Sequence, residues 1–117
     1  MKRVYVAGPY SADNVLEVLQ NIGRGEAVAL EVFKAGFAPF TPWHDKTFCI
    51  SAYDVDFSVE QFYNYSIAWL EVSDAVLLVE GWETSKGTLA EIEIAKNNDI
   101  PVFFNLNDLV SFFKQSA

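Results

Sequence analysis

The feature that most constrains the fold is a regular alternation between short apolar runs and longer segments with helical periodicity. Each apolar run is short enough to be a buried strand and is followed by a residue that breaks a strand. We expect strands at residues 4–7, 37–40, 75–79 and 101–104. We expect helices at residues 13–34, 58–72, 88–97 and 107–115. Strands that alternate with helices predict a parallel sheet with right-handed crossovers, here in the strand order 2-1-3-4.

The length of 117 residues is enough for one domain with a real core and too short for two. We therefore expect a single α/β domain over residues 1–117. It should be a Rossmann- or flavodoxin-like three-layer sandwich with a four- or five-stranded parallel sheet. Ligands of such sheets bind at the carboxyl ends of the strands where the strand order reverses, which places the site beside strands 1 and 3.

Two segments outside the strands carry apolar or aromatic side chains. The first helix has one face at helical spacing, made of Leu16, Leu19, Gly23, Ala27 and Leu30. The second expected helix, residues 58–72, has a stripe made of Phe62, Tyr65, Trp69 and Val72. Helices this apolar on so small a sheet predict a homodimer or a larger homo-oligomer. Residues 43–59 show no clear period and are expected to form a long loop, with at most a helical turn.

Composition excludes several classes of function. Sixteen acidic against eight basic residues give a net charge of −8, which argues against binding a nucleic acid polymer. No apolar run reaches the roughly 18 residues that span a membrane, and the short N-terminal apolar run is interpreted as a strand and not a signal peptide. One cysteine and one histidine exclude the usual zinc sites. We expect a cytoplasmic protein that needs no metal and no cofactor.

The strongest local motif follows the third strand and runs from Ser85 through Gly87 and Thr88 to Glu91. Ser85 and Thr88 are good N-cap residues, and Gly87 allows a ligand to approach the backbone. Glu91 is expected in the first helical turn, where the helix dipole favours an ionised carboxylate. The alternative is a capping box between Thr88 and Glu91 that only fixes the helix start.

Four segments together resemble the nucleoside 2-deoxyribosyltransferase superfamily, including its 2'-deoxynucleoside 5'-monophosphate N-glycosidases. They are residues 5–10, 73–79, 81–82 and 85–95, and the likeness extends over residues 4–102. The resemblance implies a double displacement in which Glu91 attacks the anomeric carbon and forms a glycosyl-enzyme. It also implies that Tyr5 holds this glutamate, although an aromatic residue packed in a strand is an equal alternative.

Position 85 bears on the substrate. The transferases usually have an aspartate there, whereas the monophosphate hydrolases have a serine that contacts the 5'-phosphate. Ser85 therefore favours a phosphorylated substrate, since a hydroxyl and free helix N–H groups accept an anion that an aspartate repels. The turn at residues 8–11 and Lys86 are further candidates for phosphate contacts, although Lys86 fits better as a solvated charge.

One departure from the family concerns the proton for the leaving base. The family commonly has an aspartate where this chain has Ser66, and a hydroxyl is a poor acid at neutral pH. The candidates to replace it are His44, Asp45, Asp54 and Asp56, each of which also fits as an ordinary polar loop residue.

The expected function is cleavage or exchange of the N-glycosidic bond of a 2'-deoxynucleoside or its 5'-monophosphate. The alternative is a non-catalytic nucleotide-binding module on the same fold, and a purely structural partner protein is a third possibility. Trp43 and Trp82 can stack on a base or pack in the core. The catalytic residues are predicted to be Glu91 and Tyr5. The predicted substrate contacts are Gly8, Pro9, Tyr10, Trp43, His44, Trp82, Ser85, Gly87 and Thr88.

Overall fold

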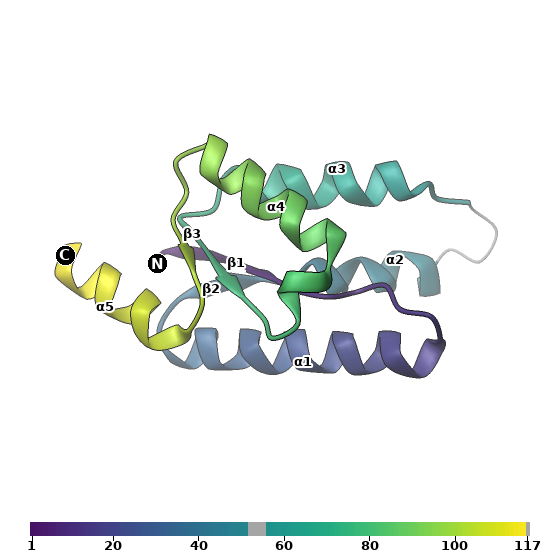
Figure 1. Cartoon of the computed structure of the whole chain (residues 1–117), viewed down its shortest axis with the longest axis horizontal. Coiled ribbons are helices and arrows are strands. Elements are labelled where there is room, and N and C mark those ends of the chain that lie inside the picture. The colour runs from purple at the N-terminus through teal and green to yellow at the C-terminus, as the bar shows by residue number, and fades with distance from the viewer. Residues whose placement is uncertain (52–55, 117) are drawn as a thin grey trace.

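The computed structural model describes residues 1–51 and 56–116 (Figure 1). The strands are β1 (Arg3–Ala7), β2 (Ala38–Phe40), β3 (Ala75–Leu78) and β4 (Val102–Phe103). The helices are α1 (Val15–Lys34), α2 (Lys46–Ser51), α3 (Val59–Leu70), α4 (Lys86–Asn97) and α5 (Leu106–Ser116). Two 3₁₀ turns, η1 (Pro42–Asp45) and η2 (Trp82–Thr84), precede α2 and α4. The ends of the predicted strands and helices fall within two residues of these bounds.

The four strands form one parallel sheet in the order β2-β1-β3-β4, which confirms the predicted order. Tyr5 lies in the middle of the sheet, where it pairs with Phe40 of β2 on one side and Val76 of β3 on the other. Helices cover both faces of this sheet, so the predicted three-layer α/β fold is confirmed with four strands.

The alternation of side chains along β1 divides the core between the two faces. Val4 and Val6 pack in the cluster that includes residues of α1 and α5. Tyr5 and Ala7 point the other way, into a cluster with Leu70 of α3 and residues of α4. In Figure 1, α1 lies on one side of the sheet and α3 and α4 lie on the other. The tyrosine hydroxyl is therefore carried toward α4.

The face of α1 that packs on the sheet is not the leucine face noted in the sequence. Leu16, Leu19 and Leu30 are 65%, 57% and 56% exposed, whereas the buried face includes Ile22, Gly25, Ala29 and Val32. Two of those residues are small, so the helix approaches the sheet closely and the larger leucine side chains are left outside. The exposed leucine face suits the expected homo-oligomer, which stays a prediction.

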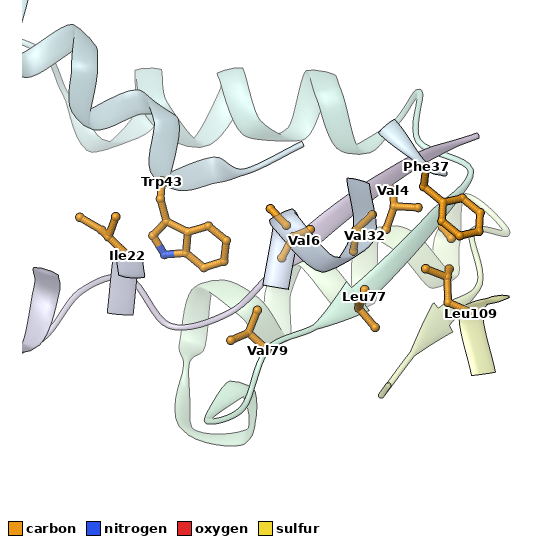
Figure 2. Packing of buried hydrophobic residues seen from close by; sticks show 11 residues of the cluster. Val4, Val6, Ile22, Val32, Phe37, Trp43, Leu77, Val79 and Leu109 are labelled. Carbon is orange, nitrogen blue, oxygen red and sulfur yellow. The ribbon is translucent and has the colours of Figure 1, made fainter. Parts of the chain in front are cut away.

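The segment after β2 is helical, so the expectation of a long loop is wrong as far as residue 51. Pro42 at the first helical position and a buried Trp43 fix η1, and α2 follows directly. The Trp43 ring is 1% exposed and lies in the core cluster with Ile22 and Val79 (Figure 2). Its indole Nε1–H donates to the carbonyl oxygen of Pro9 at 3.0 Å, which ties η1 to the end of β1.

Among the helices that the structure describes, none has the length and hydropathy needed to cross a membrane.

Candidate active site

A cavity of about 700 Å³ opens at the carboxyl ends of β1 and β3, where the sequence placed the site. Four parts of the chain line it: the turn after β1, the segment η1, one face of α3 and the start of α4. Its lining residues are Gly8, Pro9, Tyr10, Ser11, Ala12, Asp13, Pro42, Trp43, Asp45, Val59, Phe62, Tyr63, Ser66, Thr84, Ser85, Lys86, Gly87, Thr88 and Glu91.

A hydrogen bond joins the two predicted catalytic residues: the Tyr5 hydroxyl donates to Oε2 of Glu91. Burial raises the pKa of Glu91 to about 7, and the hydrogen bond from Tyr5 lowers it in part. Burial and then the Glu91 charge raise the pKa of Tyr5, so the phenol keeps its proton and remains a donor. The pair presents a carboxylate with a fixed orientation, which is what a nucleophile needs.

The position of Glu91 in its helix corrects two expectations. Helix α4 begins at Lys86, so Glu91 lies in the second turn and not in the first. The capping box between Thr88 and Glu91 does not form, since Ser85 is the N-cap and the Glu91 side chain binds Tyr5. The dipole effect falls off within the first turn, so burial decides the pKa of Glu91 and raises it.

The N-terminus of α4 faces the cavity through Ser85, Lys86 and Gly87. Ser85 Oγ accepts hydrogen bonds from the backbone N–H and the hydroxyl of Thr88, at 3.3 and 2.8 Å. Its own hydroxyl hydrogen is therefore available to a ligand in the cavity. A Cβ atom added to Gly87 would meet nothing within 4 Å, so the backbone at this position is open to an approaching group.

The turn after β1 supplies the opposite wall. A Cβ atom added to Gly8 would lie 2.6 Å from Cβ of Val79, so only glycine lets this turn pack against the end of β3. The Tyr10 backbone oxygen accepts from the Asn21 side chain at 3.1 Å. The Tyr10 hydroxyl donates to Oδ1 of Asp45 at 2.7 Å. This hydrogen bond connects the β1 turn with η1 across the cavity wall.

Two predicted contact residues are not brought to the cavity. His44 is exposed and lies edge-on to Phe48, with 6.0 Å between the ring centroids. Trp82 is partly buried, with its ring centroid 5.5 Å from that of Phe104, and packs against the core cluster on the α4 side of the sheet. Trp43 does line the cavity, but its ring is held in the core. Thr88 lines the cavity too, and it is almost fully buried with its hydroxyl bound to Ser85.

The candidate acids separate clearly. Asp45 lines the cavity and is buried, at 8% exposed. Asp56 is exposed and is not among the lining residues, and Asp54 lies outside the described residues. Ser66 does line the cavity, and its hydroxyl lowers the pKa of Tyr5 by hydrogen bonding.

One face of α3 contributes cavity residues that were not predicted as substrate contacts. Val59, Phe62, Tyr63 and Ser66 share one face of this helix and line the cavity together. Their spacing of three, one and three residues is a helical face, and it was available in the sequence. Of the aromatic stripe noted in the sequence, Phe62 lines the cavity, whereas Tyr65 and Trp69 pack beside Phe40.

Comparison with known protein families identifies the family of this chain. A family model described as a domain of unknown function, DUF4406, matches residues 2–104. The chain belongs to this family. No match was found among curated proteins.

Two solved structures share the DUF4406 chain's fold. A conserved protein from Enterococcus faecalis V583 is 16% identical with a TM-score of 0.65, over 87% of this chain and 61% of that protein. A 2-deoxyribosyltransferase from Bacillus psychrosaccharolyticus is 19% identical with a TM-score of 0.59, over 86% of this chain and 69% of the enzyme. The chain thus spans about three fifths of the Enterococcus protein's length. The expected resemblance to the deoxyribosyltransferases is confirmed for the fold.

Within residues 1–51 and 56–116, no group of three or more histidine, cysteine, aspartate or glutamate side chains is placed to hold a metal ion.

The raised pKa of Glu91 predicts a pH-dependent stability. Its folded pKa of about 7 exceeds the unfolded value of 4.5, so the stabilising contribution is complete below pH 4.5 and is lost as pH rises through 7. Glu91→Gln keeps the acceptor for Tyr5 and does not titrate. We expect this variant to be more stable than the wild type at pH 8, by on the order of 2–3 kcal/mol, and equally stable at pH 4. Urea unfolding followed by circular dichroism measures both differences, and an equal difference at the two pH values would contradict the raised pKa.

Proposed function

We propose that this protein cleaves or exchanges the N-glycosidic bond of a 2'-deoxynucleoside or its 5'-monophosphate. The observation that carries the proposal is the hydrogen-bonded pair of Tyr5 and Glu91 in a cavity at the carboxyl ends of β1 and β3. Two further facts support it: the fold is shared with a 2-deoxyribosyltransferase, and Tyr5, Ser85 and Glu91 match the pattern of that superfamily.

In this mechanism the ionised Glu91 attacks the anomeric carbon of the sugar as the bond to the base breaks. The Tyr5 hydroxyl holds the attacking carboxylate in one orientation and keeps its own proton throughout, because its pKa is raised. The product of this step is a sugar ester of Glu91 and a free base. Water that then attacks the ester gives hydrolysis, whereas a second base gives exchange.

The 5'-phosphate is assigned to the N-terminus of α4. Among the described residues that line the cavity, the ionisable side chains are the carboxyl groups of Asp13, Asp45 and Glu91 and the ammonium group of Lys86. An anion is therefore repelled from most of the wall and is accepted near Lys86, where the first N–H groups of α4 and the Ser85 hydroxyl are available.

The direct test is a panel of deoxynucleosides and their 5'-monophosphates, incubated with the purified protein and assayed for free base by chromatography. Release from monophosphates alone supports the phosphate assignment, and release that requires an added second base indicates the transferase. Absence of base release from the whole panel contradicts the enzymatic proposal.

Ser85→Asp tests the phosphate site, because aspartate is as good an N-cap as serine and preserves the start of α4. We expect kcat/KM on the 5'-monophosphate to fall at least about tenfold through charge repulsion, with the nucleoside unaffected. The matched control is Ser111→Asp at an exposed position of α5, which adds the same charge away from the cavity. Equal losses on nucleoside and monophosphate would exclude a phosphate contact at Ser85.

A non-catalytic nucleotide-binding module is the second candidate, and Ser66 in place of the expected acid favours it. In that case nucleotides raise the melting temperature while the panel yields no base. If no nucleotide changes the melting temperature, this candidate fails as well.

A further inference from the structure

Breaking a glycosidic bond to a nucleobase calls for a proton donor, because a base that leaves as an anion leaves slowly. Of the described residues around the cavity, three have carboxyl side chains: Asp13, Asp45 and Glu91. Glu91 is taken as the nucleophile, and Asp13 is exposed to water. Ser66, which also lines the cavity, has only a hydroxyl to offer. Asp45 is therefore the one buried carboxyl group among these three that does not serve as the nucleophile.

The surroundings of Asp45 act on the pKa of its carboxyl group in both directions. Burial raises its pKa, and the groups that act in the opposite sense are Tyr10, Lys46 and His44. Lys46 is engaged elsewhere, since its Nζ lies 2.7 Å from Oε1 of Glu26 on α1. His44 is exposed, so water screens its charge. Burial prevails, so the pKa of Asp45 lies above the ordinary value of an aspartate.

Asp45 lines the same cavity as Glu91, and a hydrogen bond holds its carboxyl group in one orientation. Its Oδ1 accepts the Tyr10 hydroxyl at 2.7 Å, which leaves Oδ2 as the position for an acidic proton. When Asp45 is ionised, its charge also contributes to the raised pKa of Tyr5, so the two groups are near enough to interact. Tyr10 fixes its orientation from the opposite wall and is a positioning residue.

We propose that Asp45 is the catalytic acid that protonates the departing base, in place of the aspartate that Ser66 replaces; this assignment rests on the proposed function. As Glu91 forms its bond to the anomeric carbon, the bond from that carbon to the base nitrogen breaks. The electron pair remains with the base, which takes the proton of Asp45 and leaves neutral. In hydrolysis the Asp45 carboxylate then takes a proton from the attacking water, and the Glu91 carboxylate is released. The reactive state thus holds one proton between the two carboxyl groups.

The test compares two substrates that share one sugar. The first is the best natural substrate from the panel, and the second is the 4-nitrophenyl glycoside of the same deoxyribose or its 5-phosphate. Nitrophenolate leaves without a proton, so its release does not need the acid. For Asp45→Asn we expect kcat on the natural substrate to fall by about 10²- to 10⁴-fold, with less than about a tenfold change on the nitrophenyl substrate. Asp99→Asn, at the exposed turn after α4, is the matched control and should change neither rate.

Chemical rescue gives a second and independent readout. Asp45→Ala removes the carboxyl group and leaves room for formate, which should restore turnover of the natural substrate in proportion to its concentration. Equal losses on both substrates, no loss on either, or failure of formate to rescue would each overturn the assignment to Asp45. Failure of the proposed function looks different: the wild type then releases neither base nor nitrophenol, and both ideas fall together.

Discussion

Glu91→Gln is expected to reduce turnover by roughly 10⁴- to 10⁶-fold, the scale of loss when a covalent nucleophile is removed. The amide has nearly the shape of the carboxylate and can still accept the hydrogen bond of Tyr5. It cannot form the ester intermediate, however, because an uncharged amide is a very poor nucleophile. Single-turnover assays with the best substrate of the panel measure the loss directly.

The same variant contains its own control for folding. Since removing the buried charge is expected to stabilise the protein near neutral pH, an inactive Glu91→Gln protein with a raised melting temperature has lost chemistry and not structure. Mass spectrometry of the wild type during turnover should detect the added sugar on the peptide that contains Glu91. Full activity of Glu91→Gln would remove Glu91 from the mechanism.

Gly25→Ala is the second large effect, and it acts on stability. A Cβ atom at this position would lie 2.5 Å from atoms of the Trp43 ring, closer than atoms can pack. The ring cannot yield easily, because it is buried and its Nε1–H is bound to Pro9. Such overpacking costs about 3 kcal/mol, which lowers the melting temperature of a domain of this size by roughly 10–20 °C.

Gly23→Ala is the matched control for this effect, because it lies on the same helix and its added Cβ would meet nothing within 4 Å. Alanine is the better helix former, so this variant should gain about 0.5–1 kcal/mol. Opposite signs for the two substitutions test the contact between α1 and Trp43, and two equal shifts would contradict it. Gly25→Ala should also slow catalysis, since Trp43 precedes Asp45 by two residues in η1.

Together these experiments separate the three parts of the site. Glu91 reports on bond formation at the sugar, Ser85 on the phosphate, and Asp45 on the leaving base. The three variants are expected to show different patterns of loss. Glu91→Gln loses turnover of every substrate, Ser85→Asp loses the preference for the monophosphate, and Asp45→Asn loses turnover of the natural substrate while that of the activated one is largely kept.

Sequence patterns were sufficient to predict the strand order and the edge of the sheet at which the cavity lies. The strand order and the location of the cavity follow from the spacing of apolar residues within each segment and from the right-handed crossovers between strands. Both of these act on segments that are neighbours along the chain. Tyr5 and Glu91 were paired from the resemblance, and strand alternation then carries the Tyr5 hydroxyl toward α4. The turn after β1 and the N-terminus of α4 were placed at the cavity for the same reason.

Only the tertiary structure decided the features that depend on contacts between distant segments. Both faces of α1 carry apolar residues at helical spacing, so this spacing could not show which face packs on the sheet. The contact between the Trp43 ring and Gly25 selects the face with small residues. Four residues qualified as the acid by type, and burial against Tyr10 distinguishes Asp45 from His44 and Asp56. The pKa of Glu91 depends on how much water the fold removes, which no local pattern encodes. Sequence thus determined the strands, the longer helices and their order, and packing determined which side chains meet and how they are charged.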